Sequence, residues 1–295
     1  DLAYQTYNTC KNFNLKVGFI GDGKLLITDN TNVIVCINES IDNIPNIKFK
    51  YKIIDEAHHI EQSDSKIREK MNKIKCEKEI EFSATFKSQH SLDFDYSIEE
   101  AENDGYITPY KLHIEYFTQG DRMNGLLDIL CEKAEWFPTL IYFNSTKRAK
   151  EFCDRLNTRK ICSDYIIAKT NAKKRKEIYE SLKNGEVKIV CLCGCWNEAI
   201  SIDEVQSVIF GDLRHSDINK IQIAMRGNRL HKNKPFFRIV LPIIKDNLNE
   251  KDIKKLLNSF SERDNRIKKA IENRSVSRIK ININSDEPIV DAEFL

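Results

Sequence analysis

The chain contains 295 residues, of which 41% are hydrophobic and 31% are charged, enough to form one large core or two cores of ordinary domain size. This composition excludes an intrinsically disordered chain, and no run approaches the roughly 18 to 20 apolar residues that a bilayer span requires. The 47 basic and 45 acidic residues leave a formal net charge of +2, so we expect any contact with nucleic acid to be local.

The first half contains four strand-like runs, at residues 15–20, 32–38, 49–55 and 79–85. These runs are short, rich in β-branched residues and bounded by turn residues, which predicts a first sheet. Gly105 and Pro109 then mark a crossing segment, so we place a domain boundary near residue 118.

The second half alternates strands with helices. Strands are predicted at 139–144, 165–169, 187–193, 206–212 and 237–243. One helix follows the first of these strands, with Ser145 or Thr146 as its cap and an apolar stripe formed by Ala149, Phe152, Cys153 and Leu156. Another covers residues 173–185, with Ile178 and Leu182 facing inward and Gly185 at its end. This alternation predicts an α/β fold with a doubly wound, mostly parallel sheet.

From residue 249 onward, apolar residues recur at helical spacing, which predicts a long amphipathic helix or a helix pair. The predicted domains are therefore residues 1–118, 119–248 and a helical tail at 249–295.

Nine cysteines lie along the chain without the paired spacing of a disulfide framework. We therefore expect free thiols and an intracellular, reducing compartment, such as the cytoplasm, the nucleus or a viral particle. Cys191, Cys193 and Cys195 form one cluster, on a run that alternates as a strand. Because no fourth ligand lies nearby, packing beneath a sheet is favoured over a metal site.

An acidic pair carries the strongest chemical signal. Asp55 and Glu56 follow the strand-like run KYKII, and His58 and His59 come directly after them. Ligands of parallel sheets gather at the carboxyl ends of strands, so this pair is suited to hold a hydrated magnesium ion and to polarise a water molecule. The alternative is an acidic pair that caps the next helix, and this short motif alone leaves both interpretations open.

Two further segments supply context. Ser83, Ala84 and Thr85 close the run EIEFSAT, and Gln222, Arg226 and Arg229 are spaced within INKIQIAMRGNRLH. With the DEAH sequence at 55–58, the order of these segments resembles that of superfamily 2 helicases, ATP-driven translocases built from two RecA-like domains. The resemblance extends to the fourth motif at 141–145, the fifth at 197–202 and the sixth at 222–229, and covers the chain to about residue 243.

The resemblance implies an ATP-dependent helicase with ATP and Mg²⁺ as cofactors and with hydrolysis in an interdomain cleft. Asp55 would hold magnesium through water, and Glu56 would activate the attacking water. Arg226 and Arg229 would act as arginine fingers, with Gln222 beside them in the same catalytic motif. The alternative is that both arginines are surface cations and that His58 and His59 only begin a helix.

The same resemblance assigns residues to coupling and to nucleic-acid binding. The coupling residues would be His58, Ser83 and Thr85. The residues contacting single- or double-stranded nucleic acid would be Asn38, Ser40, Asn144, Ser145, Thr146, Asn197 and Glu198. The variants NEAISI and MRGNRLH look most like helicases of large DNA viruses, which favours DNA over RNA.

The sequence departs from the family pattern at Ala199, Ser201 and Met225, which puts catalytic efficiency in doubt. The run GFIGDGK at 18–24 satisfies G-x-x-x-x-G-K, but Leu25 follows it, and the next residues favour turns and strands over a helix. We therefore expect that residues 18–24 do not form a phosphate-binding loop.

By resemblance, residues 1–5 look like the tail of the family's motif Ia, so the chain is expected to begin inside an incomplete first RecA-like domain. The isolated chain should then be almost inactive on ATP. A helicase-like scaffold that binds nucleic acid or protein without hydrolysing ATP is the alternative.

Overall fold

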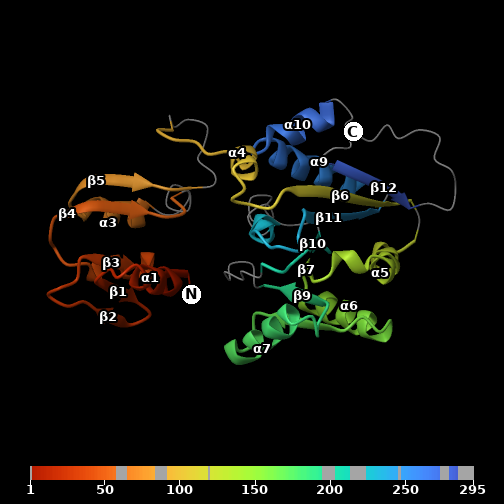
Figure 1. Cartoon of the computed structure of the whole chain (residues 1–295), viewed down its shortest axis with the longest axis horizontal. Coiled ribbons are helices and arrows are strands. Elements are labelled where there is room, and N and C mark those ends of the chain that lie inside the picture. Colours follow the sequence, from red (N-terminus) through yellow and green to blue (C-terminus); the bar gives the residue numbers. More distant parts are fainter. Residues whose placement is uncertain are drawn as a thin grey trace. The chain divides into compact units, whose positions relative to one another are not determined.

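The computed structural model describes residues 2–57, 65–83, 92–118, 120–194, 203–212, 224–244, 247–272 and 279–284. The chain divides into two compact units, Asp1–Asp95 and Tyr96–Leu295, which Figure 1 shows in red to orange and in yellow to blue. In each unit, the sheets position the candidate functional residues.

The first unit contains two small sheets. Its helices are α1 (Leu2–Asn12), the 3₁₀ helix η1 (Asn38–Asn43) and α3 (Ser65–Lys73). Its strands are β1 (Val17–Gly21), β2 (Lys24–Leu26), β3 (Val33–Cys36), β4 (Phe49–Ile54) and β5 (Cys76–Glu81). One sheet has the order β2-β1-β3, with β2 antiparallel and β3 parallel to β1, and the other consists of the parallel pair β4-β5.

Each of these sheets packs against one helical layer. In the first, Phe19 of β1 meets Tyr4 and Tyr7 of α1, with ring centroids 5.6 Å apart in both contacts. In the second, Ile54 of β4 is buried with Met71 of α3 and residues of η1. Two small cores therefore hold the first unit together.

The opposite face of β4-β5 is apolar and exposed. Ile53 pairs with Ile80 in the parallel register, and Ile53 is 64% exposed. Tyr51 of β4 and Phe82, which directly follows β5, are exposed as well. Parallel sheets are usually covered on both faces. The strand expected at 49–55 is instead buried on one face only, where α3 and η1 cover it.

The second unit contains a seven-stranded sheet with the order β12-β6-β11-β10-β7-β9-β8, and every pair in it is parallel. Its strands are β6 (Tyr110–Phe117), β7 (Thr139–Phe143), β8 (Ser163–Ile167), β9 (Ile189–Cys193), β10 (Ser207–Phe210), β11 (Phe237–Ile244) and β12 (Ile279–Asn284). Its helices are α4 (Ile98–Asn103), α5 (Arg122–Glu132), η2 (Ala134–Trp136), α6 (Thr146–Thr158), α7 (Ala172–Lys183), η3 (Arg226–Asn228), α9 (Asn247–Ser261) and α10 (Asn265–Glu272).

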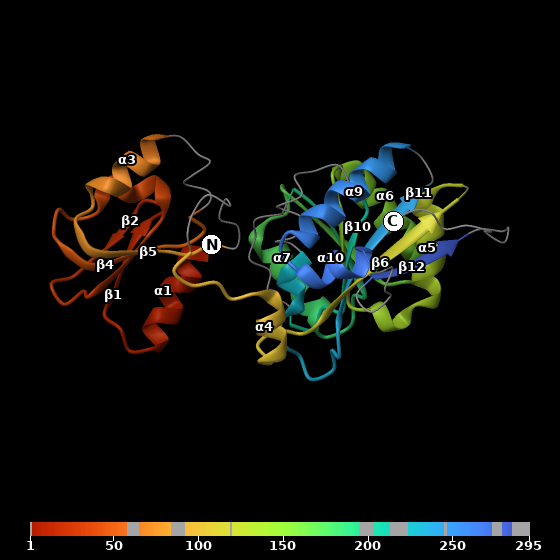
Figure 2. The ribbon, with the colours of Figure 1, turned by 90° about the horizontal axis from the view of Figure 1, so that it is seen from above.

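Helices cover both faces of this sheet, as Figures 1 and 2 show. Residues of α7, α9 and α10 form one core with one face of the strands, and residues of α5 and α6 form a second core with the other face. This arrangement confirms the predicted α/β fold with a doubly wound parallel sheet. No helix among the described residues is both long and apolar enough to cross a membrane.

The predicted helices and thiols of this unit have the expected environments. The apolar stripe of α6 is buried, Ser145 is its cap, and Gly185 ends the α7 segment with a positive φ of 75°. Cys191 and Cys193 are both buried in the core beneath the sheet. Cys195 lies outside the described residues.

The division of the chain differs from the sequence-based boundary near residue 118. The structure divides between residues 95 and 96, because β6 pairs with β11 and β12 inside the second sheet. Tyr110, Leu112 and Ile114 alternate into the core on the α9 side of that sheet. The tail also differs from the purely helical prediction, since β12 follows the helix pair and becomes an edge strand.

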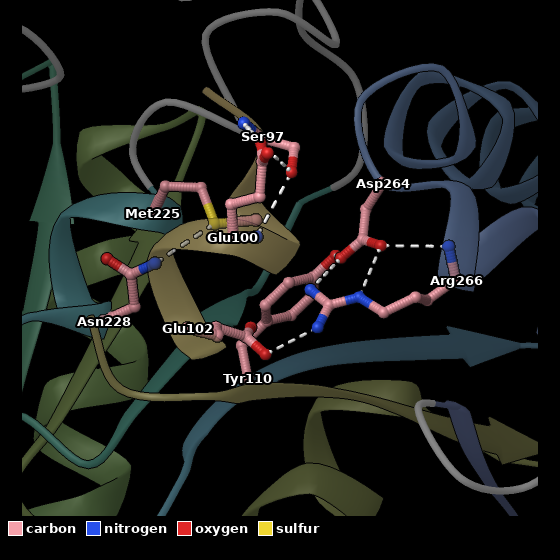
Figure 3. A network of polar contacts seen from close by, with 8 residues as sticks. All are labelled: Ser97, Glu100, Glu102, Tyr110, Met225, Asn228, Asp264 and Arg266. Carbon is pink, nitrogen blue, oxygen red and sulfur yellow. Dashed lines mark hydrogen bonds and ion pairs between the residues drawn. The ribbon is translucent and has the colours of Figure 1, made fainter. Parts of the chain in front are cut away.

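A buried ionic network anchors the segment before β6 to the helix pair, as shown in Figure 3. Arg266 of α10 bonds Glu102 of α4 at 2.8 Å and Asp264 at 2.7 Å. The hydroxyl of Tyr110 donates to Asp264 at 2.9 Å. Burial alone would raise the pKa of the Asp264 carboxyl, but the hydrogen bonds from Arg266 and Tyr110 outweigh it and lower that pKa. The network therefore attaches α4 to α10 and to the start of β6 within the second unit.

A second buried polar group, His113 of β6, lies on the opposite face of the sheet. Its side chain is 7% exposed, neither ring nitrogen has a hydrogen-bond partner among the described residues, and its ring lies edge-on to Trp136 at 5.9 Å. Burial, helped by the nearby cations of Arg238, Lys280 and other lysines, lowers the pKa of His113 to about 4.

The network predicts a large effect of Arg266→Met. The variant leaves the carboxylates of Glu102 and Asp264 buried without their shared cation, which should cost about 3–5 kcal/mol of the free energy of unfolding. Urea denaturation measures this loss. Lys268→Met, which removes an exposed cation from the same helix, is the control and should change stability little. Equal losses in the two variants would contradict the role of the network.

His113 should make the free energy of unfolding depend on pH in the acid range. Because the folded pKa of His113 lies below the unfolded value, unfolded chains bind the extra proton first, and stability falls as the pH drops from 6.5 towards 4. This residue should account for a loss on the order of 1–3 kcal/mol across that window. His113→Phe should reduce the loss when unfolding free energies at pH 6.5 and 4.5 are compared. An unchanged pH dependence in the variant would exclude this cause.

Candidate functional site

The acidic pair of the first unit lies directly after β4. Ile54 and Ala57 are buried on either side of it and fix its position, while Asp55 is exposed and Glu56 is partly buried. Glu56 has a positive φ of 51°, a conformation that costs non-glycine residues about 1–3 kcal/mol and is concentrated at functional sites. The backbone N–H of Glu56 donates to the Asp55 carboxylate at 3.0 Å.

Backbone hydrogen bonds bring this pair beside the end of β5. The N–H of Ala57 donates to the carbonyl of Phe82 at 2.9 Å, and the N–H of Phe82 donates to the carbonyl of Ile54 at 2.8 Å. Ser83 follows at once, so the structure brings together Asp55, Glu56 and Ser83. His58 and Thr85 lie outside the described residues.

The chemistry of the acidic pair fits a hydrated magnesium ion. Mg²⁺ keeps several of its waters and is usually bound through one or two carboxylates, so it needs no complete set of protein ligands. Asp55 is exposed and can contact such an ion through water. Among the described residues, no group of three or more His, Cys, Asp or Glu side chains is placed to hold a metal directly.

The G-x-x-x-x-G-K run forms a hairpin. Residues Gly21 and Lys24 pair at the ends of antiparallel β1 and β2, and Asp22 and Gly23 form the turn with φ values of 49° and 71°. Two positive φ angles in a two-residue loop are typical of a type I′ turn. The next regular element is strand β3, so the run does not supply the helix start that a phosphate-binding loop requires.

The sixth-motif segment of the second unit is anchored at several points. The carbonyl of Asn228 accepts the N–H of Thr108 at 2.6 Å, and the carbonyl of Gly227 accepts a hydrogen bond from Lys234 at 2.7 Å. Burial lowers the pKa of Lys234 to about 8. Arg229 follows this segment and is exposed. The side chain of Arg226 and all of Gln222 lie outside the described parts of the chain.

The residues predicted to contact nucleic acid lie in both units. Asn38 is exposed and Ser40 partly buried on η1 of the first unit. In the second unit, Ser145 accepts the N–H of Arg148 at 3.5 Å as the cap of α6. Thr146 donates to the sulfur of Cys193 at 3.7 Å. These two hydroxyl groups therefore have structural partners. Asn197 and Glu198 lie outside the described residues.

Sequence reasoning missed an ionic cluster at the start of α6. The carboxylate of Asp212 is 5% exposed and accepts the backbone N–H of Asn144 at 2.9 Å. It also forms ion pairs with Arg148 and, at 3.4 Å, with Arg122 of α5. The available signal was an acidic residue directly after a predicted strand, in QSVIFGD, but nothing in the sequence identified its arginine partners.

The register of two strands produces this cluster. Phe210 of β10 pairs with Tyr142 of β7, which places Gly211 beside Phe143 and Asp212 beside Asn144. Gly211 permits the approach, because a Cβ atom there would lie 2.5 Å from a ring carbon of Phe143. The cluster therefore depends on a glycine that precedes the acid.

Two family models match the sequence. The helicase conserved C-terminal domain matches residues 121–231, and the type III restriction enzyme res subunit matches residues 1–88. No curated protein matches the chain significantly.

Solved structures with a similar fold include a restriction-modification enzyme and a DEAD box protein. The ATP-dependent Type ISP restriction-modification enzyme LlaBIII bound to DNA has a TM-score of 0.68 and 14% identity, over 97% of this chain and 25% of that one. Dbp5 of S. cerevisiae bound to RNA and ADP BeF3 has a TM-score of 0.62 and 13% identity, over 97% and 75%. A DEAD box protein from Methanococcus jannaschii has a TM-score of 0.55 and 19% identity, over 96% and 77%.

The chain thus spans a quarter of the length of the LlaBIII chain. At these identities the structural likeness shows the fold, which matches RecA-like helicase domains. The family matches and the fold together support a superfamily 2 helicase.

The glycine before Asp212 generates a prediction. Gly211→Ala should destabilise the second unit by about 1–3 kcal/mol, because the added methyl group must displace the buried ring of Phe143. Urea denaturation measures the loss. In a Phe143→Leu background, which removes the obstructing ring, the same substitution should cost less. Equal costs in the two backgrounds would show that the contact with Phe143 does not require the glycine.

Proposed function

We propose that this chain is a fragment of an ATP-dependent nucleic-acid helicase or translocase, in which ATP hydrolysis drives movement on a strand. The observation that carries the proposal is the acidic pair after β4, held beside Ser83 by backbone hydrogen bonds. The two helicase-related family matches, one on each part of the chain, support the same conclusion.

In this proposal ATP with Mg²⁺ supplies the phosphoryl group, and the side chains position it and balance its charge. Asp55 holds the ion through water, and Glu56 orients the attacking water. The positive φ of Glu56 supports such a role. Because of this strained backbone conformation, its side chain points in a different direction from the side chain of a residue in an extended strand. His58, Ser83 and Thr85 couple the nucleotide state to the grip on the strand.

The sixth-motif residues act on the same nucleotide in this proposal. Arg226 and Arg229 neutralise charge on the transferring phosphate, an effect on the order of a thousandfold or more in rate, and Gln222 assists them. The exposure of Arg229 and the fixed backbone around Gly227 support this role, since a charge-stabilising cation must be both accessible and held.

We further propose that the helicase is of the DEAH form, acts on DNA in preference to RNA, and derives from a large DNA virus. The family match to a restriction-enzyme subunit and the DEAH sequence at 55–58 support the first two statements. LlaBIII is bound to DNA in its structure and Dbp5 to RNA, so a strand of either kind suits this fold. The scattered thiols favour a reducing compartment inside the cell.

One observation favours the alternative of a scaffold that binds nucleic acid or protein without hydrolysis. The G-x-x-x-x-G-K run is a hairpin, so residues 18–24 provide no backbone cradle for the β and γ phosphates. The gene sequence separates the two proposals. A reading frame that extends upstream through a glycine-rich GK[ST] segment supports the helicase, whereas a start codon near Asp1 supports the scaffold.

The proposal predicts the ATPase behaviour of two proteins. The 295-residue chain should hydrolyse ATP near the background rate. A form of the chain extended by an upstream GK[ST] segment, where the reading frame supplies one, should show hydrolysis stimulated by single strands. Phosphate release measures both rates. In the extended protein, Glu56→Gln should lower the rate at least about a hundredfold, within the range ascribed to a group that activates the nucleophile.

Glu77→Gln is the matched control, because Glu77 lies on β5 in an exposed pair with Lys48 at 3.3 Å, and it should keep the full rate. Stimulated hydrolysis by the 295-residue chain that Glu56→Gln abolishes would contradict the assignment of residues 18–24. An extended protein that binds strands but does not hydrolyse ATP would support the scaffold.

A further inference from the structure

The ionic cluster around Asp212 lies where the second unit is proposed to contact a strand. Asn144, the first residue of the predicted contact segment in this unit, donates its backbone N–H to the Asp212 carboxylate at 2.9 Å. The carboxylate itself is 5% exposed and is surrounded by two guanidinium groups. A buried charge with this set of partners fixes the turn between β7 and α6.

The two hydroxyl groups of that turn already have partners. Ser145 caps α6 through the N–H of Arg148, and Thr146 donates to Cys193. Their hydroxyl groups lie close to the backbone and serve the fold of the turn. A longer side chain with donors left for a ligand is therefore needed if this turn grips a phosphate.

Arg148 has the required properties. Its side chain is 41% exposed although one end of its guanidinium group is paired with the buried Asp212. A guanidinium group carries five donors in a rigid plane, so the carboxylate can hold one edge while another edge meets a phosphate. The ion pair also fixes the orientation of the side chain before a ligand binds, which reduces the entropy lost on binding.

We propose that Arg148 contacts the backbone phosphates of a bound strand and that Asp212 is the positioning residue for this contact. The proposal rests on the proposed function, since it names a contact for the strand that the helicase fragment would bind. It adds two residues to the predicted contact segment and gives the buried carboxylate a role in binding as well as in folding.

The experiment measures binding of the full chain to a fluorescein-labelled single-stranded 20-mer, as DNA and as RNA, by anisotropy at several salt concentrations. Arg148→Ala should weaken binding about tenfold and reduce the slope of log K against log salt by about 0.7, the value for one phosphate contact on a single strand. Arg148→Lys retains the charge and should retain the slope while recovering part of the affinity.

Asp212→Asn tests the positioning role. The amide oxygen can still accept the N–H of Asn144, but the charge that holds Arg148 is lost. Affinity should therefore fall about threefold or more while the salt slope stays at its wild-type value, because Arg148 keeps its charge. Circular dichroism and melting of each variant monitor folding, and the Arg148 variants test the contact even if Asp212→Asn fails to fold.

Two matched controls lie on the same helix. Arg159 forms an ion pair with Asp128 at 3.2 Å at the opposite end of α6, so Arg159→Ala removes an equivalent pair and should leave binding unchanged. Lys147→Ala removes the neighbouring cation, which pairs with Glu151 at 3.7 Å, and should have a smaller effect than Arg148→Ala.

The outcomes separate this inference from the proposed function. A wild-type chain that binds neither strand refutes both. A wild-type chain that binds, with Arg148→Ala no weaker than Arg159→Ala or Lys147→Ala, refutes the contact alone. Unchanged or tighter binding by Asp212→Asn refutes the positioning role, because it would show that the carboxylate withholds Arg148 from the strand.

Discussion

The register of neighbouring parallel strands is the constraint on which the candidate residues depend. Parallel strands end at the same edge of a sheet, so residues that follow them become neighbours however far apart they lie in the sequence. The pairing of β4 with β5 brings the acidic pair beside Ser83, and the pairing of β7 with β10 brings Asn144 beside Asp212. A shift of one residue in either pair would separate these groups.

The buried carboxylates of Asp264 and Asp212 in the second unit are stable because each one has several partners. Asp264 receives hydrogen bonds from Arg266 and Tyr110, and Asp212 receives them from a backbone amide and two arginines. Such carboxylates hold helices and turns on the sheet more specifically than apolar contacts do. Removing one partner costs a large part of the free energy of unfolding, because it leaves a buried charge uncompensated. His113 differs, because its ring nitrogens are buried with no such partner among the described residues.

The two units differ in how their sheets are covered. The seven-stranded sheet has helices on both faces, whereas β4-β5 has one covered face and one exposed apolar face. The acidic pair therefore depends on a small core, in which Ile54 and Ala57 are its nearest anchors. The exposed apolar face of the parallel pair β4-β5 therefore affects the stability of the first unit.

Much of the second unit could be predicted from the sequence, because strict periodicity and caps such as Ser145 act locally. The hairpin at 18–24 was also predictable, since Leu25 and the following residues oppose a helix. The membership of β6 and β12 in the second sheet was not, because strand pairing depends on distant partners such as Phe237. For the same reason, no local sequence pattern indicated that Arg122 and Arg148 meet Asp212.

The proposed function requires the acidic pair and the sixth-motif arginines to act on the same hydrolytic step. Single-turnover ATP hydrolysis by a form of the chain extended by an upstream GK[ST] segment tests this requirement, with Glu56→Gln, Arg229→Ala and the double variant. We expect both single variants to be slow and the double variant to be little slower than the worse of them, as is found for residues that act as a unit. A wild-type rate in either single variant would show that the altered residue takes no part in hydrolysis and would contradict this proposal.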